Sequence, residues 1–227
     1  MKPTTNPLVM VAFVTCVSIF APAALQATLI SVSTTAPLAD DADIANLDLT
    51  TIIDDFQSSI IWGDRPARGQ SFMTGISSGG FELDAITIQS ANSQNANGTY
   101  FIRVGAVSGT SFTEMRAESV VTTEDVVAND YVTFTLDTPI SLQASTLFGF
   151  DIGRSGSGWR LLNNAQTEYL DGSAYTSGGG GMGGLTISGN NQDRIFHLNM
   201  TAIPEPSSSA LVILGGLGLI LRRRPCA

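Results

Sequence analysis

The groups in this chain that could carry out acid–base or nucleophilic chemistry do not form a recognisable constellation. His197 is the single histidine of the sequence, so a two-histidine relay or a His-rich metal site is excluded. In the alternating pattern around it, Phe196, Leu198 and Met200 share one face, and we expect His197 to be exposed on the other. A serine triad would need His197 beside a nucleophile in a G-x-S-x-G context, and we expect no such context in this chain. Paired carboxylates for glycoside hydrolysis remain open because acids are plentiful, but we expect no enzyme.

Two further sets of side chains could bind a ligand. Asp40, Asp41 and Asp43 are the densest acidic cluster, and calcium takes oxygen ligands of this kind. The cluster lacks the ligand order and the glycine of an EF-hand loop, so a solvated loop is favoured and Ca²⁺ is the one cofactor left open. Trp62 and Trp159 could stack on sugar rings, although an indole within a strand is more often a core residue, which is the interpretation favoured for Trp159.

Residues 1–27 have the pattern of a secretory signal peptide. Lys2 supplies a basic start, Leu8 to Phe20 form an apolar run, and small residues follow up to Ala27. We predict cleavage after Ala27, and a cut after Ala23 stays open as the alternative. The rest of the chain is then exported.

The last residues, 204–227, form a second segment that does not belong to a folded domain. Pro204-Glu205-Pro206 is followed by a serine-rich and apolar stretch over 207–221 and by Arg222, Arg223 and Arg224. The apolar part makes a helix of roughly 18–22 Å, shorter than the ~30 Å hydrocarbon layer, which is more typical of a temporary tether than of a permanent anchor. The arginines keep their end on the cytoplasmic side. The two prolines favour an extended handle just outside the membrane.

This order of parts resembles the PEP-CTERM sorting signal, which exosortases recognise in bacteria with a two-membrane envelope. The resemblance covers residues 204 to 224 and has an export signal at the other end of the chain. It implies that Pro204, Glu205 and Pro206 are recognition residues and that Arg222 to Arg224 retain the tail in the inner membrane. It further implies cutting near the motif and delivery to the cell surface or an exopolysaccharide matrix. The ending Pro225-Cys226-Ala227 departs from the family, whose chains more often stop at the basic cluster.

Composition limits the partners and the covalent chemistry of residues 28–203. The two cysteines, Cys16 and Cys226, both lie outside this range, so it holds no disulfide, thiolate metal site or cysteine nucleophile. It has nineteen acidic residues against seven arginines and no lysine, which gives a net charge near −12. We do not expect a domain of this charge to bind nucleic acid or anionic membranes.

Period-two patterning predicts an all-β fold for residues 28–203, an antiparallel β-sandwich of jelly-roll type. One short helix is expected within Ile44 to Phe56. The middle also resembles the small β-sandwich domains that often precede such sorting signals, through Gly69 to Phe72, Leu83 to Ile88, Phe134 to Leu136 and Leu147 to Phe150. The predicted strands are Gln70 to Thr74, Phe81 to Gln89, Tyr100 to Gly105, Val132 to Leu136, Phe148 to Gly153, Trp159 to Leu162, Leu185 to Ser188 and Arg194 to Ala202.

Taken together, the sequence predicts an exported envelope or extracellular-matrix protein with a structural, adhesive or exopolysaccharide-associated role. Its expected partners are an exosortase, an extracellular polysaccharide and, transiently, the inner membrane. The alternatives are a carbohydrate-binding module, a secreted hydrolase, and a single-pass surface protein that is never processed.

Overall fold

The computed structural model describes residues 28–47, 52–54, 68–155, 158–164, 169–177, 185–187 and 193–205. Within these ranges the chain forms strands and no helix, and every pairing between named strands is antiparallel. The predicted all-β, antiparallel class is therefore confirmed. The strands are β1 (Leu29–Ser33), β2 (Ile44–Asn46), β3 (Ile52–Asp54), β4 (Arg68–Met73), β5 (Phe81–Gln89), β6 (Thr99–Ser108), β7 (Ser111–Val121), β8 (Tyr131–Leu142), β9 (Leu147–Arg154), β10 (Leu162–Asn164), β11 (Ala174–Ser177), β12 (Leu185–Ile187), β13 (Asp193–Arg194) and β14 (Phe196–Ala202).

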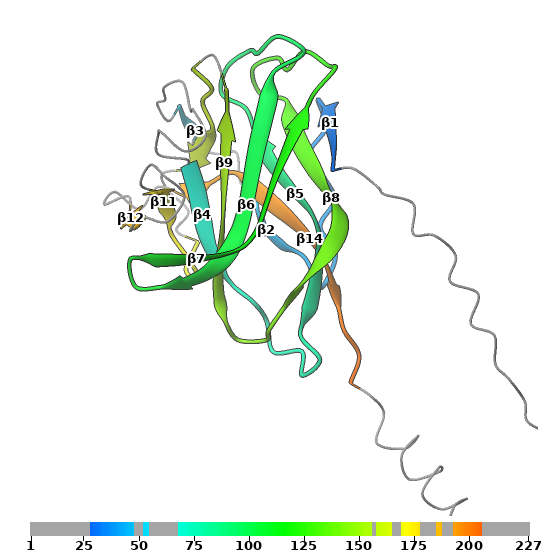
Figure 1. Ribbon diagram of the computed structural model, residues 1–227, viewed down its shortest axis with the longest axis vertical. Coiled ribbons are helices and arrows are strands. Elements are labelled where there is room, and N and C mark those ends of the chain that lie inside the picture. The colour runs from blue at the N-terminus through cyan, green and yellow to red at the C-terminus, as the bar shows by residue number, and fades with distance from the viewer. Residues whose placement is uncertain are drawn as a thin grey trace, which may run out of the picture.

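Two larger sheets carry most of the structure. One has the order β1-β8-β5-β14-β2 and the other β12-β11-β4-β9-β6-β7, while β13-β10-β3 form a smaller third sheet. The chain moves from one large sheet to the other between β4 and β5, β5 and β6, β7 and β8, and β8 and β9. Only β6 and β7 are joined directly as a hairpin in this region, and Figure 1 shows this long hairpin lying across β5, β8 and β14.

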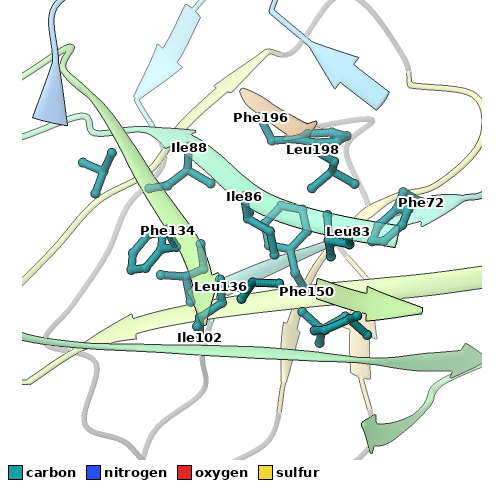
Figure 2. Packing of buried hydrophobic residues seen from close by; sticks show 14 of the residues in the cluster. Phe72, Leu83, Ile86, Ile88, Ile102, Phe134, Leu136, Phe150, Phe196 and Leu198 are labelled. Atoms are coloured by element: carbon teal, nitrogen blue, oxygen red, sulfur yellow. The ribbon is translucent and has the colours of Figure 1, made fainter. Parts of the chain in front are cut away.

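The largest apolar cluster among the described residues is shared by the two large sheets. The ring of Tyr100 on β6 meets Phe134 on β8 at 6.0 Å between centroids, and Phe150 on β9 meets Phe196 on β14 at 5.6 Å. Figure 2 shows the same interleaving, with Phe72, Ile102 and Phe150 from one sheet among Leu83, Ile86, Ile88, Phe134, Leu136, Phe196 and Leu198 from the other. These side chains alternate along their strands, as the period-two pattern predicted.

The predicted short helix within Ile44 to Phe56 is wrong for the residues described there. Ile44–Asn46 is β2 and pairs with β14, and Ile52–Asp54 is β3 and pairs with β10. Both segments are only three residues long, so their conformation is set by the strands beside them and not by a local pattern.

Several sequence predictions concern residues outside the described ranges. These are the signal peptide over 1–27 with its cut after Ala27, the end of the motif at Pro206, the helix over 207–221, the basic residues Arg222 to Arg224, and Trp62. In the described ranges, no helix has the length and apolar character needed to cross a membrane.

The shared core predicts a large effect of truncating one of its rings. Phe150 is 0% exposed and contacts aromatic rings on two other strands, so Phe150→Ala should lower the free energy of unfolding by about 3–5 kcal/mol. Leu38, which is 95% exposed, is the matched control, and Leu38→Ala should change it by less than about 0.5 kcal/mol. Urea unfolding followed by tryptophan fluorescence measures both. Equal effects of the two substitutions would contradict the core described above.

Candidate functional site

The described chain ends at a fixed point on the surface of the fold. Strand β14 stops at Ala202, and the backbone N–H of Ile203 donates to the carbonyl of Gly80 at 3.0 Å. The hydroxyl of Ser77 donates to the carbonyl of Ile203 at 3.2 Å. A Cβ on Gly79 would lie 2.2 Å from that carbonyl oxygen, so only glycine allows this approach. The turn before β5 therefore holds the chain up to residue 203.

Pro204 and Glu205 follow directly and are both exposed. They are the two residues of the predicted sorting motif that the structure describes. Ile203 is hydrogen-bonded on both its N–H and its carbonyl, and the predicted motif begins at the next residue.

The same turn contains a pattern that the sequence interpretation missed. Gly75-Ile76-Ser77-Ser78-Gly79 has the spacing of a nucleophile elbow. In the structure it joins β4 to β5, two strands, and Ser77 is bound to Ile203. Ile203 lies six residues beyond His197 along an extended segment, about 20 Å away, so Ser77 has no histidine beside it. The pattern belongs to the chain exit and does not form a serine triad.

His197 is not exposed, contrary to the sequence expectation. Its side chain is 4% exposed, and Nε2 lies 2.8 Å from Oδ2 of Asp43. The prediction that Phe196, Leu198 and Met200 face the core is confirmed. The error arose on the opposite face, which is covered by the segment leading into β2 because that strand pairs with β14.

The acidic cluster is a structural turn and not an open set of ligands. Oδ1 of Asp40 accepts from the N–H of Ala42 at 2.9 Å, and Oδ1 of Asp43 accepts from the N–H of Met200 at 2.7 Å. Both oxygens of Asp43 thus have partners within the protein, so the solvated loop expected there is wrong for this residue. In the part of the chain that is described, no group of three or more His, Cys, Asp or Glu side chains could hold a metal ion.

Trp159 is a core residue, as favoured. It is 0% exposed, packs edge-on against Tyr100 with centroids 4.9 Å apart, and donates from Nε1 to Ser90 Oγ at 2.9 Å. A ring enclosed in this way cannot stack on a sugar, so the glycan-stacking role considered for Trp159 is excluded in this conformation.

Polar side chains that the sequence gave no signal for link the sheets internally. Gln70 on β4 donates from Nε2 to Asp193 Oδ1 at 2.8 Å and accepts from the N–H of Arg194 at 2.9 Å. Arg194, which is 0% exposed, donates from NH1 to Asn163 Oδ1 at 2.6 Å. These bonds join β4, β10 and β13.

A buried ion pair between Arg103 and Asp151 lies within the six-stranded sheet. Arg103 on β6 donates to both oxygens of Asp151 on β9, at 2.8 and 2.6 Å. Burial by itself would lower the pKa of Arg103, but the hydrogen bonds and charge of Asp151 outweigh it and raise that pKa. The pair is a permanently charged cross-strand link.

The carboxyl groups of Glu118 on β7 and Asp137 on β8 form a third polar feature. Arg116 lies between them, with Nε 3.3 Å from Glu118 Oε1 and NH1 3.1 Å from Asp137 Oδ1. Burial, together with hydrogen bonding and the charge of Asp137, raises the pKa of Glu118 to about 7, against the opposing charge of Arg116. The two carboxyl groups border a hollow of about 400 Å³. Unlike the two buried networks, this pair of carboxyl groups lies beside a pocket at the protein surface.

Comparison of the chain with protein-family models, with curated proteins and with solved structures finds no match.

The contacts of Asp43 lead to a test of its structural role. Asp43→Ala removes the acceptor of two hydrogen bonds to buried partners and should lower the free energy of unfolding by about 2–3 kcal/mol. Asp41, which is exposed, is the matched control, and Asp41→Ala should stay within about 0.5 kcal/mol of the parent. Thermal unfolding with and without added Ca²⁺ measures both effects. A calcium-dependent gain in stability that both substitutions abolish would contradict the assignment of Asp43 to a structural turn.

Proposed function

We propose that this chain is an exported protein whose C-terminal segment is a PEP-CTERM sorting signal handled by an exosortase. The signal peptide over 1–27 directs it across the inner membrane, where the segment over 207–221 and Arg222 to Arg224 hold it briefly. Cutting near Pro204-Glu205-Pro206 then releases it to the outer surface or the extracellular matrix. The role proposed there is structural, adhesive or exopolysaccharide-associated, and not enzymatic.

One observation carries this proposal: the predicted motif begins at the residue after Ile203, which is hydrogen-bonded on both its N–H and its carbonyl. A protease or transpeptidase binds its substrate as an extended segment, because main-chain groups must be accessible along the cleaved strand. Pro204 and Glu205 are exposed, and Ile203 before them is fixed to Gly80 and Ser77. An enzyme could therefore engage the motif without opening β14.

The fold also suits a passive role at the surface. We propose that the two large sheets form a β-sandwich of jelly-roll type, supported by the core they share and by the repeated passage of the chain from one sheet to the other. The excess of acidic residues in 28–203 favours solubility outside the cell and contacts through bridging cations with an anionic matrix.

Intact-mass analysis of the full chain expressed in an exosortase-containing host tests the proposal. We expect the recovered protein to lack the residues beyond the motif and to begin after the signal peptide. Pro204→Ala combined with Glu205→Ala should reduce the processed fraction at least tenfold. The motif would lose the restricted backbone of Pro204 and the negative charge of Glu205, by which the enzyme is proposed to recognise it. Glu124→Ala, at another exposed glutamate, should be processed like the parent.

The same experiment tests the alternative of a single-pass surface protein that is never processed. Retention of the chain through Ala227 in the parent protein would support an unprocessed membrane anchor and overturn the proposal. Full processing of the Pro204 and Glu205 variant would show that the enzyme does not read these residues.

A further inference from the structure

The hollow beside Glu118 lies where the mature chain is expected to begin. Besides Glu118 and Asp137, it is lined by Thr28, the first residue after the predicted cut. In the pairing of β1 with β8, Leu29 lies opposite Thr135, so continuing the register by one residue places Thr28 opposite Leu136, next to Asp137. Strand β1 also contacts β7, which carries Glu118. Figure 1 shows β1 beside β8, at the outer side of the five-stranded sheet.

The carboxyl groups around this hollow contact Arg116 as ion pairs. Both oxygens of Glu118 and Oδ1 of Asp137 are shielded from solvent, and among the described residues they have no hydrogen-bond partner of normal geometry. The side chain of Glu118 is only 13% exposed. Oxygens in this position cost free energy unless a donor or a cation reaches them.

The charges at the site do not balance in the full-length chain. Glu118 and Asp137 are the charged residues among those that line the hollow, and Arg116, also on β7, contacts both. Two carboxylates therefore face one guanidinium group. Burial is the largest cause of the rise in the pKa of Glu118 to about 7, and the hydrogen bond and charge of Asp137 add to it, so that a retained proton reduces the negative charge of the pair.

We propose that this hollow is the docking site for the α-ammonium group that signal-peptide removal creates on Thr28. The inference rests on the proposed export of the chain and on cleavage after Ala27. Hydrolysis of the bond between Ala27 and Thr28 consumes one water, leaves a carboxyl group on Ala27, and leaves an amine on Thr28 that takes up a proton at neutral pH. The new group brings a further positive charge and three N–H donors to carboxyl groups that already contact Arg116. Two carboxylates then face two cations.

Docking fixes the start of the mature chain. A cut after Ala23 would leave four more residues before Thr28 and carry the amine past the hollow. The pair of carboxyl groups therefore favours the cut after Ala27 over that alternative. It also ties β1, an edge strand hydrogen-bonded to β8 alone, to β7 in the opposite sheet.

The composition of the chain provides a direct test. Lys2 is the single lysine of the sequence and is lost with the signal peptide, so the α-amine is the one primary amine in the mature protein. An amine-selective acylating reagent then reports on Thr28 alone. The protein is produced from the full gene, exported and recovered from the host, and the label is measured by mass on its N-terminal peptide.

We expect the folded protein to react at pH 7 about tenfold more slowly than the same protein in urea, because neighbouring carboxylates raise the pKa of the ammonium group by about one unit above its usual value near 8. Glu118→Gln and Asp137→Asn should each restore much of the rate. Glu124→Gln, the same chemical change at an exposed site, should react like the parent.

Each outcome decides the matter. A chain that begins at Thr28 and reacts equally fast in the folded state and in urea overturns the docking proposal while leaving export intact. A chain that begins at Ala24 overturns it because the amine does not reach the hollow. A chain that retains Met1 overturns the proposed export itself. If either variant fails to fold, the parent's rate in the folded state against that in urea still decides.

Discussion

The structure depends on the burial of one face of each large sheet against the other. The described residues contain no cysteine, so no disulfide assists this contact. Rings from both sheets meet at the centre, Tyr100 with Phe134 and Phe150 with Phe196, and Trp159 closes one side against Tyr100. Burying each large apolar side chain contributes about 1.5–3 kcal/mol, which is the dominant favourable term for a domain of this kind. The packing of the two sheets also positions the end of β14, the turn at Asp43, and the carboxyl groups of Glu118 on β7 and Asp137 on β8.

Apolar packing alone does not fix how strands slide along one another, and the buried polar groups supply that restriction. The side chain of Arg194 donates to Asn163 Oδ1 and to the carbonyl of Gly69 at one register, because a shift would leave a buried charge without acceptors. Arg103 and Asp151 do the same between β6 and β9. The hydrogen bonds of these buried polar residues therefore help to fix the register of the strands that they join.

The sequence predicted what repeats along a single strand and missed what depends on a distant partner. Strands β5, β6, β8 and β9 were predictable because their side chains alternate between core and surface. β2 and β3 are too short to show a period and exist because β14 and β10 pair with them. The burial of His197 could not be predicted either, since Asp43 covers it from 154 residues away in sequence. The carboxyl pair of Glu118 and Asp137 could not be predicted for the same reason, whereas the resemblance at Pro204 to Pro206 is local in sequence and stays a prediction.

Both proposals concern the N-terminus and the C-terminus that processing would create, and the contacts near these two termini differ. At the C-terminal side, Ile203 is hydrogen-bonded to Gly80 and Ser77, and the proposed cut lies beyond it. At the N-terminal side, the proposed docking adds a cation beside Glu118 and Asp137. A chain that still carries its signal peptide would therefore hold β1 less firmly than the processed chain. A weaker hold on β1 before processing would suit export, because a polypeptide must stay unfolded until it has crossed the membrane. The contact of the Thr28 ammonium group with Glu118 and Asp137 would form only after the signal peptide has been removed.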